Sequence, residues 1–267
     1  MSVTHVFKVV DGLSLEIDVL SPTTKDENTP VILHFHGGFL VHDNISKRVV
    51  IAGSSAGGYL ALAATAHPAT PKPLALLSIY GMMDSAGERY IHPGQPLGAL
   101  LEDEAQVLKE VEDAMRADAI DGYAFPMDPP ADSRFRWIMA LHQAAQFPDV
   151  LTRKPGLGAR IAGEGLGAIL EEDRVLFPVR FGLKEGFPPT VLLHGDADDV
   201  VGFEQSVAVA EGLKAVGVDV SLERAEGQGH GFEVQDVIDL DGDEALGDKD
   251  VIDPLRRVIV HLERHVQ

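Results

Sequence analysis

The pattern of apolar and polar positions at the start of the chain predicts an antiparallel hairpin. Between residues 13 and 20 apolar and polar side chains alternate, which is the period of a strand with one buried face. Another apolar run covers residues 6–10. Asp11 and Gly12 separate the two runs, and Asp-Gly is typical of tight hairpin turns. We therefore expect two antiparallel strands here.

Short apolar runs alternate with helical patterns over much of the remaining chain. Residues 218–224 are predicted to form a strand, and nearly continuous apolar runs occupy residues 31–36, 48–52, 74–80 and 190–194. Such runs are typical of strands that are buried on both faces of a parallel sheet. Helical patterns cover residues 56–66, 204–215 and 255–265, the last beginning just after Pro254. The alternation predicts an α/β fold with a mostly parallel central sheet and flanking helices.

A long stretch in the middle of the chain interrupts this pattern. Residues 85–177 contain helical patterns at 102–119 and 133–145, and a glycine-rich segment at 156–167 that we expect to be irregular. We interpret this stretch as a mainly helical lid or cap inserted into the sheet domain. The predicted organisation is a core in two parts, 1–84 and 178–267, with the insertion between them.

Charge and composition exclude several classes of protein. The chain has 22 basic and 42 acidic residues, a formal net charge of −20, so it repels phosphate backbones and anionic lipid. Cysteine is absent, which excludes disulfides and a thiolate nucleophile. Neither a signal peptide nor an apolar run long enough to span a membrane is visible. We expect a cytoplasmic protein that binds no nucleic acid.

A serine lies between a predicted strand and a predicted helix. Gly53 and Gly57 flank Ser55 at two positions on either side. Small residues at this spacing allow a sharp turn from strand to helix, which raises the serine hydroxyl above the sheet. Because a serine hydroxyl is a weak nucleophile until a base takes its proton, this interpretation needs a base elsewhere in the chain. The alternative is an ordinary Gly/Ser turn that caps a helix.

Adjacent glycines follow an earlier buried strand. Gly37 and Gly38 come directly after His36. Glycines leave backbone N–H groups unobstructed, and such donors stabilise the oxyanion that forms in acyl transfer. The predicted oxyanion-hole donors are Gly37, Gly38 and Ala56; an ordinary turn at a strand end is the alternative. His34 and His36 are interpreted as structural.

A candidate acid and a candidate base come late in the chain, each after a predicted strand. Asp198 follows the strand at 190–194, and His230 lies between glycines after the next strand. The order Ser55, Asp198, His230 is that of α/β hydrolases. His230 would take the serine proton, and Asp198 would orient the imidazole. Asp196 and Asp199 are competing acids.

These motifs resemble those of known hydrolases. Residues 36–39 and 53–58 together resemble the hormone-sensitive-lipase-like esterases, whose oxyanion loop reads His-Gly-Gly-Gly. Residues 194–201 are similar to the acid loop of prolyl-oligopeptidase-like hydrolases, in which the first Asp of the Asp-Asp pair is the acid; this resemblance selects Asp198. Residues 229–232 resemble the histidine loop of both groups. The resemblance covers most of the chain outside the insertion and implies an α/β-hydrolase fold.

The chain departs from the family in one place. Only residues 37–47 separate the oxyanion strand from the strand that leads to Ser55, where the family has a further strand and two helices. Parallel neighbours usually need a crossover of about a dozen residues or more. The missing strand predicts an open sheet edge, and the third glycine of the oxyanion loop is Phe39 here.

The sequence therefore favours a serine hydrolase of carboxylic esters and leaves two alternatives open. One is a peptidase or amidase of prolyl-oligopeptidase type. The other is a catalytically impaired or non-enzymatic hydrolase-fold protein, because of the short link. Trp137, Phe125 and Phe135 in the insertion favour a small-molecule ester with an apolar acyl or alcohol group.

The sequence predicts neither a cofactor nor a metal. The acidic residues Asp239, Asp241, Asp243 and Asp250 resemble a calcium loop in spacing, but the glycine is misplaced and Asp250 stands where glutamate is usual. A solvated acidic loop is the better interpretation. The natural substrate and the oligomeric state stay open.

Overall fold

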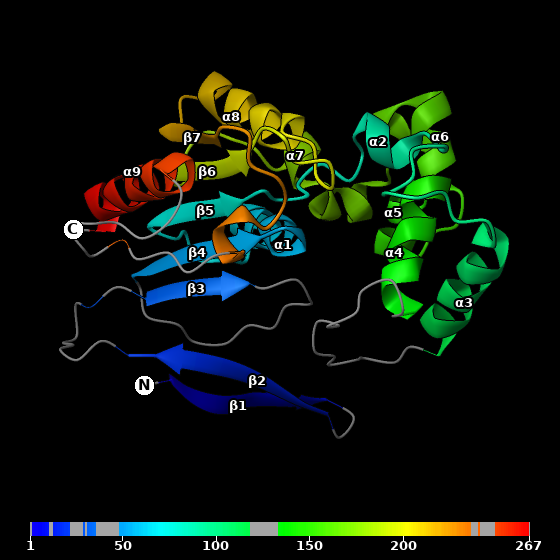
Figure 1. Ribbon diagram of the computed structural model, residues 1–267, viewed down its shortest axis with the longest axis horizontal. Coiled ribbons are helices and arrows are strands. Elements are labelled where there is room, and N and C mark those ends of the chain that lie inside the picture. Colours follow the sequence, from blue (N-terminus) through cyan, green and yellow to red (C-terminus); the bar gives the residue numbers. More distant parts are fainter. Residues whose placement is uncertain are drawn as a thin grey trace. The chain divides into compact units, whose positions relative to one another are not determined.

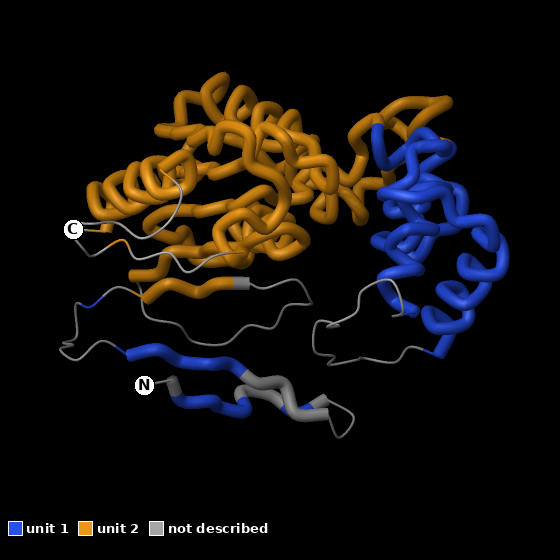
Figure 2. The backbone as a smooth tube through the Cα atoms, in the orientation of Figure 1, with its two compact units in different colours: residues 1–29, 89–159 blue, residues 30–88, 160–267 orange. Residues whose placement is uncertain are grey.

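The computed structural model describes residues 2–10, 13–21, 29, 31–35, 48–117, 133–235, 240 and 249–266. The chain divides into two compact units (Figure 2). The first combines residues 1–29 with 89–159, and the second combines residues 30–88 with 160–267.

A five-stranded sheet forms the centre of the second unit (Figure 1). Its strands are β3 (Val31–Phe35), β4 (Val49–Ser54), β5 (Ala75–Ile79), β6 (Thr190–Gly195) and β7 (Val220–Ala225). They lie in the order β3-β4-β5-β6-β7, and every neighbouring pair is parallel. The predicted α/β class with a mostly parallel sheet is confirmed.

Helices cover both faces of this sheet. The helices of the unit include α1 (Ala56–Ala66), α7 (Pro178–Phe181), α8 (Glu204–Ala215) and α9 (Lys249–Val266), with the short 3₁₀ helices η2 (Leu166–Ala168), η3 (Glu171–Leu176) and η4 (Phe232–Val234). Leu76 and Leu192 pack in one core with α1 and α8, whereas Val191 and Leu193 pack in a second core with α9. Because neighbouring residues of a strand point to opposite faces, this division explains the continuous apolar runs.

Helix α9 begins earlier than the sequence pattern predicted. We expected a helix at 255–265, after Pro254, but the helix runs from Lys249 to Val266 with Pro254 inside it. Proline removes one backbone N–H donor from a helix. Val251, Ile252 and Pro254 are themselves buried against the sheet. Burial of these side chains offsets the missing hydrogen bond. The rule that proline marks a helix boundary considers only the local sequence, so it does not include this tertiary effect.

Strand β3 is the edge strand of the described sheet. It pairs with β4 on one side, from Val31 opposite Val49 to Phe35 opposite Gly53. Val31 and Ile32 are 41% and 61% exposed. An open edge of this kind is what the absence of one strand predicts. The link 37–47 itself lies outside the described residues.

The first unit contains the predicted hairpin and several helices. Strands β1 (Ser2–Val10) and β2 (Leu13–Leu20) pair antiparallel, with a register shift between Val6 and Lys8. The helices are α2 (Glu88–Ile91), α3 (Glu104–Arg116), α4 (Ser133–Ala144) and α5 (Phe147–Thr152), whereas α6 (Leu157–Glu164) begins in this unit and continues into the second. The described residues between 85 and 177 contain no strand. A lid function for this stretch stays a prediction.

The glycine-rich segment at 156–167 is helical, contrary to our expectation of irregular structure. Its residues form all of α6 and the start of η2. A Cβ atom at Gly158 would lie 2.5 Å from the carbonyl oxygen of Ala145, so this glycine allows a close helix approach. The Asp149 carboxylate accepts hydrogen bonds from the N–H groups of Gly156 and Gly158 and caps the helix start. These are tertiary contacts that glycine content does not reveal.

A largely buried ion pair anchors the segment that follows β5. The side chain of Asp84 is 7% exposed, and its carboxylate accepts hydrogen bonds from Arg180 of α7. The Asp84 N–H donates to the side chain of Gln205 in α8, over 2.6 Å. The segment after β5 is therefore attached to two helices.

Replacement of Arg180 by Met is expected to lower the free energy of unfolding by about 3 kcal/mol, because it leaves the Asp84 carboxylate buried without its counter-ion. Urea denaturation measures this change. Lys109→Met is the matched control, since it removes an exposed pair with Asp113, and exposed pairs contribute little to stability. Equal losses in the two variants would show that the Asp84 pair is no more important than a surface pair.

Candidate active site

Ser55 lies at the junction of β4 and α1 in a strained backbone conformation. Its φ is 53° and its ψ is −125°, values that a residue with a side chain rarely adopts. The turn is held by three backbone hydrogen bonds: the Ser55 N–H donates to Ile79, and the Ser55 carbonyl accepts from Gly58 and Met82. A Cβ atom at Gly53 would lie 2.0 Å from the carbonyl oxygen of Gly57, which explains the glycine at this position.

Replacement of Ser55 by Gly is expected to give a protein about 1 kcal/mol or more stable than the Ser55→Ala variant, because glycine adopts positive φ without strain. Urea denaturation of the two variants measures the difference. Ala63→Gly, in the middle of α1, is the control and should lose about 1 kcal/mol. If Ser55→Gly were no more stable than Ser55→Ala, the turn would not be strained.

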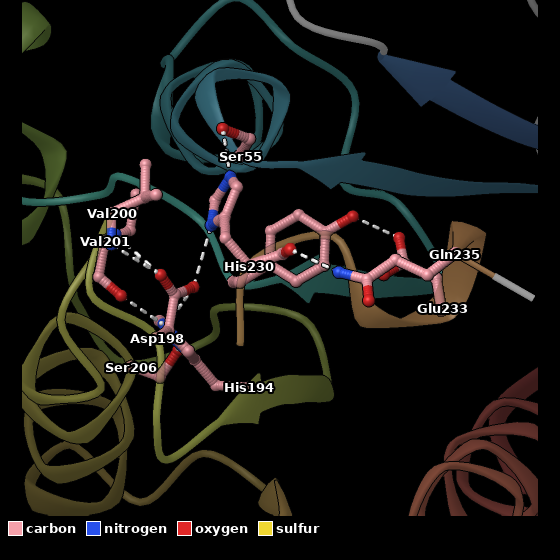
Figure 3. Close-up of polar contacts among 10 residues, drawn as sticks. Ser55, His194, Asp198, Val200, Val201, Ser206, His230, Glu233 and Gln235 are labelled. Atoms are coloured by element: carbon pink, nitrogen blue, oxygen red, sulfur yellow. Dashed lines mark hydrogen bonds and ion pairs between the residues drawn. The ribbon is translucent and has the colours of Figure 1, made fainter. Parts of the chain in front are cut away.

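His230 contacts Ser55 on one side of its ring and Asp198 on the other (Figure 3). Its Nε2 lies 3.0 Å from the Ser55 Oγ, and its Nδ1 lies 2.7 Å from the Asp198 Oδ2. An ionised carboxylate only accepts hydrogen bonds, so Nδ1 carries the proton. Nε2 is then the acceptor, directed at the serine hydroxyl. The Ser55 side chain makes no capping hydrogen bond to α1 that would compete.

The structure separates Asp198 from the two other candidate acids. Asp196 accepts hydrogen bonds from the side chain of Arg224, over 2.5 Å, and from the N–H of Gly227, over 2.6 Å. Asp199 is exposed. The Asp198 carboxylate is the one that contacts His230, and the N–H groups of the two valines that follow fix its other oxygen, each at 2.9 Å.

The surroundings of Asp198 keep its carboxylate ionised. Burial alone would raise its pKa, but hydrogen bonds from His194, His230 and the Val201 N–H outweigh burial and hold the pKa far below its ordinary value. A carboxylate whose pKa is lower in the folded than in the unfolded chain stabilises the fold at every pH above its unfolded pKa of about 4. This contribution to the free energy of unfolding is lost as the pH falls through the lowered pKa. Asp198 therefore stays charged throughout the neutral and mildly acidic range.

Four further side chains surround these three residues and were not predicted. His194 is fully buried, with Nε2 2.8 Å from the Val201 carbonyl oxygen and 3.4 Å from the Asp198 carboxylate. Its Nδ1 lies 2.7 Å from the Ser206 hydroxyl. Tyr80 packs against the His230 ring, and its hydroxyl donates to Glu233. The motif at 194–201 includes His194, but no sequence signal connects Tyr80 with a loop 150 positions away.

The predicted oxyanion-hole residues are only partly described. Ala56 is the first residue of α1, where backbone N–H groups have no partner within the helix. Gly37 and Gly38 fall outside the described residues, as does His36.

In the insertion, Trp137 lies in α4 and its indole N–H donates to Glu110 of α3 over 3.3 Å. Phe135 lies in α4 as well, whereas the placement of Phe125 is not described.

Neither a metal site nor a membrane span is found in the described residues. No group of three or more His, Cys, Asp or Glu side chains in that part of the chain could hold a metal ion. Of the acidic residues at 239–250, Asp250 lies in the first turn of α9 and the other three are not described. In the described ranges no helix is both long and apolar enough to cross a membrane.

Comparison with solved structures identifies the fold. A Staphylococcus aureus protein of unknown function aligns over all of both chains with a TM-score of 0.58 and 14% identity. A thermophilic esterase of Thermogutta terrifontis, solved with butyrate bound, aligns over 98% of this chain and 94% of its own, with a TM-score of 0.51 and 16% identity. This chain has the α/β-hydrolase fold.

Sequence comparison finds more distant relatives. No family model matches the chain. Non-reducing polyketide synthases of Aspergillus calidoustus and Emericella nidulans are each 25% identical to it, over 74% and 70% of its length. The chain spans 9% and 8% of the length of these two proteins. The match therefore concerns an α/β-hydrolase-sized part of much longer chains.

Proposed function

We propose that this chain is a serine hydrolase that cleaves carboxylic esters through an acyl-enzyme on Ser55. The observation that carries the proposal is the continuous hydrogen-bonded chain from Ser55 through His230 to Asp198, which begins at a strained turn. Strain of this kind persists only where the surrounding structure fixes it, and it is concentrated at functional sites.

The geometry defines a role for each residue in acyl transfer. His230 takes the proton of Ser55 through Nε2 as the serine oxygen attacks the ester carbonyl. The resulting imidazolium carries protons on both nitrogens, and the charge of Asp198 stabilises it. His230 then gives its proton to the leaving alcohol, which departs and leaves the acyl group on Ser55. Water activated by the same histidine releases the acid and restores the enzyme.

The negative charge that develops on the carbonyl oxygen needs hydrogen-bond donors. The N–H of Ala56 is one candidate, and Gly37 and Gly38 are the others. Each donor of this kind contributes about 10² to 10³ in rate. The proposal assigns these three residues to the oxyanion hole.

A thioester is the second candidate substrate. The relatives at 25% identity are polyketide synthases, and Ser55, His230 and Asp198 would attack a thioester carbonyl in the same way as an ester carbonyl. The Thermogutta terrifontis protein with butyrate bound is an esterase, which favours the ester and gives the acyl group for a test.

A matched set of butyryl substrates tests the proposal. The p-nitrophenyl ester, a simple alkyl thioester and the p-nitroanilide present one acyl group with three leaving groups. We expect turnover of the ester first, then the thioester, with little cleavage of the anilide. Faster cleavage of the thioester would select the second candidate, and an anilide cleaved as fast as the ester would indicate an amidase. The Ser55→Ala protein is the blank in each assay.

A further inference from the structure

Tyr80, the residue after β5, has an unusual backbone. Its φ is 38°, a value that glycine adopts easily and that a bulky side chain rarely adopts. Its N–H donates to the carbonyl of Leu193 in β6 over 2.7 Å, and the residue is 4% exposed. A tyrosine retained in this conformation points to a requirement for its side chain at this place.

The side chain of Tyr80 makes two contacts with the loop that carries His230. Its ring lies against the imidazole, with the centroids 4.5 Å apart and the planes inclined by 53°. Its hydroxyl donates a hydrogen bond to the carboxylate of Glu233, three positions after His230. One side chain of the sheet domain thus contacts both the candidate base and the turn behind it.

The second contact is strengthened by charge and burial. Burial raises the pKa of the Tyr80 hydroxyl well above its ordinary value. The hydrogen bond to Glu233 and the negative charge of Glu233 raise this pKa further. The hydroxyl therefore keeps its proton and remains a donor. The second oxygen of Glu233 is buried, and within the described part of the chain it has no hydrogen-bond partner. The bond from Tyr80 is thus a main stabilising contact of this carboxylate.

We propose that Tyr80 and Glu233 are positioning residues that hold the imidazole of His230 within reach of Ser55. The loop after β7 has glycines at 227, 229 and 231, and the Gln235 side chain donates a hydrogen bond to the His230 carbonyl over 3.1 Å. These features act on the backbone of the loop and leave rotation of the imidazole about its own bonds unrestricted. The Tyr80 ring restricts rotation of the imidazole, and the bond to Glu233 fixes the turn Phe232–Val234. The inference rests on the proposed function, since it concerns the base of that reaction.

A double-mutant cycle tests the proposal. Tyr80→Phe and Glu233→Leu are each expected to lower kcat about tenfold with KM unchanged, the effect of losing one hydrogen bond to a charged group. The double variant should lose about the same factor, because both changes break one bond. Glu233→Gln, which keeps an acceptor, should restore most of the rate.

Tyr59→Phe is the matched control. Tyr59 is a partly buried tyrosine of α1 whose hydroxyl donates to the carbonyl of Leu176 over 2.9 Å. Its variant should lose stability to a similar extent and keep kcat. Losses that multiply to about a hundredfold in the double variant, as for independent sites, would overturn the proposal. A Tyr80→Phe variant no slower than Tyr59→Phe would also overturn it.

A proton NMR measurement on His230 tests this inference separately from the proposed function, because it does not require the protein to hydrolyse a substrate. The Nδ1 proton of His230, bonded to Asp198, should give a downfield proton resonance that is missing in a His230→Gln variant. We expect it to persist in Tyr59→Phe and to broaden by exchange in Tyr80→Phe. If the natural chain cleaved no ester, the proposed function would fail and this spectrum would still decide the positioning role. An unchanged resonance in Tyr80→Phe would overturn that role.

Discussion

Replacement of Ser55 by Ala is expected to lower kcat for ester hydrolysis by about 10⁶-fold, because no acyl-enzyme can form without the nucleophile. The fold should be retained, since the serine side chain makes no capping bond to α1 and its backbone bonds remain. A p-nitrophenyl butyrate assay measures the loss, and far-UV circular dichroism verifies that the variant is folded.

Thr65→Ala is the matched control for this variant. It removes a hydroxyl from the same helix, one that donates to the carbonyl of Ala61 over 2.8 Å. We expect its kcat to stay within a few-fold of the natural chain, because this hydroxyl bonds within α1, ten positions after Ser55. Substantial activity in Ser55→Ala, together with a folded spectrum, would show that another residue is the nucleophile.

Replacement of Asp198 by Asn is expected to lower kcat by about 10⁴-fold, with KM little changed. An asparagine amide can donate to Nδ1 of His230, which would move the ring proton to Nε2. A protonated Nε2 cannot accept the proton of Ser55. Asparagine has nearly the same volume as aspartate, so the substitution creates no cavity. The loss of kcat therefore reports the change of tautomer in the imidazole.

Asp196→Asn and Asp199→Asn are the controls for Asp198. Asp196 is held by Arg224 and Gly227, and Asp199 is exposed. Both variants should hydrolyse the ester at close to the natural rate. If Asp196→Asn were the variant that lost activity while Asp198→Asn remained active, the assignment of the acid would be wrong.

The fold follows from the sequence where burial leaves a clear period. Residues 13–20 alternate and form one strand of a hairpin, and the apolar runs at 74–80 and 190–194 form parallel strands that pack into a core on each face of the sheet. The pattern fails where distant contacts override local preference. Pro254 is accommodated in a helix that buries it, and the helix at 157–164 begins with Gly158 packed on Ala145 and hydrogen-bonded to Asp149.

The spacing of glycine and serine, and the chain order of acid and base, are sufficient to select Ser55 and His230 as candidates. Among three neighbouring aspartates, the resemblance of residues 194–201 to a known acid loop selects Asp198, and the structure supplies a physical reason for that choice. The N–H groups of Val200 and Val201 hold one oxygen of Asp198, so its other oxygen faces His230. Tyr80 and Glu233 could not be foreseen, because their contact joins strand ends that are far apart in the sequence. Gly37 and Gly38 stay predictions.

Covalent labelling of Ser55 by a fluorophosphonate tests the central claim most directly, because the reaction requires an activated nucleophile and no knowledge of the natural substrate. We predict one adduct per chain by intact mass spectrometry, on the peptide that contains Ser55, and none in Ser55→Ala. A folded sample that takes up no label, or takes it up on another residue, would contradict the account.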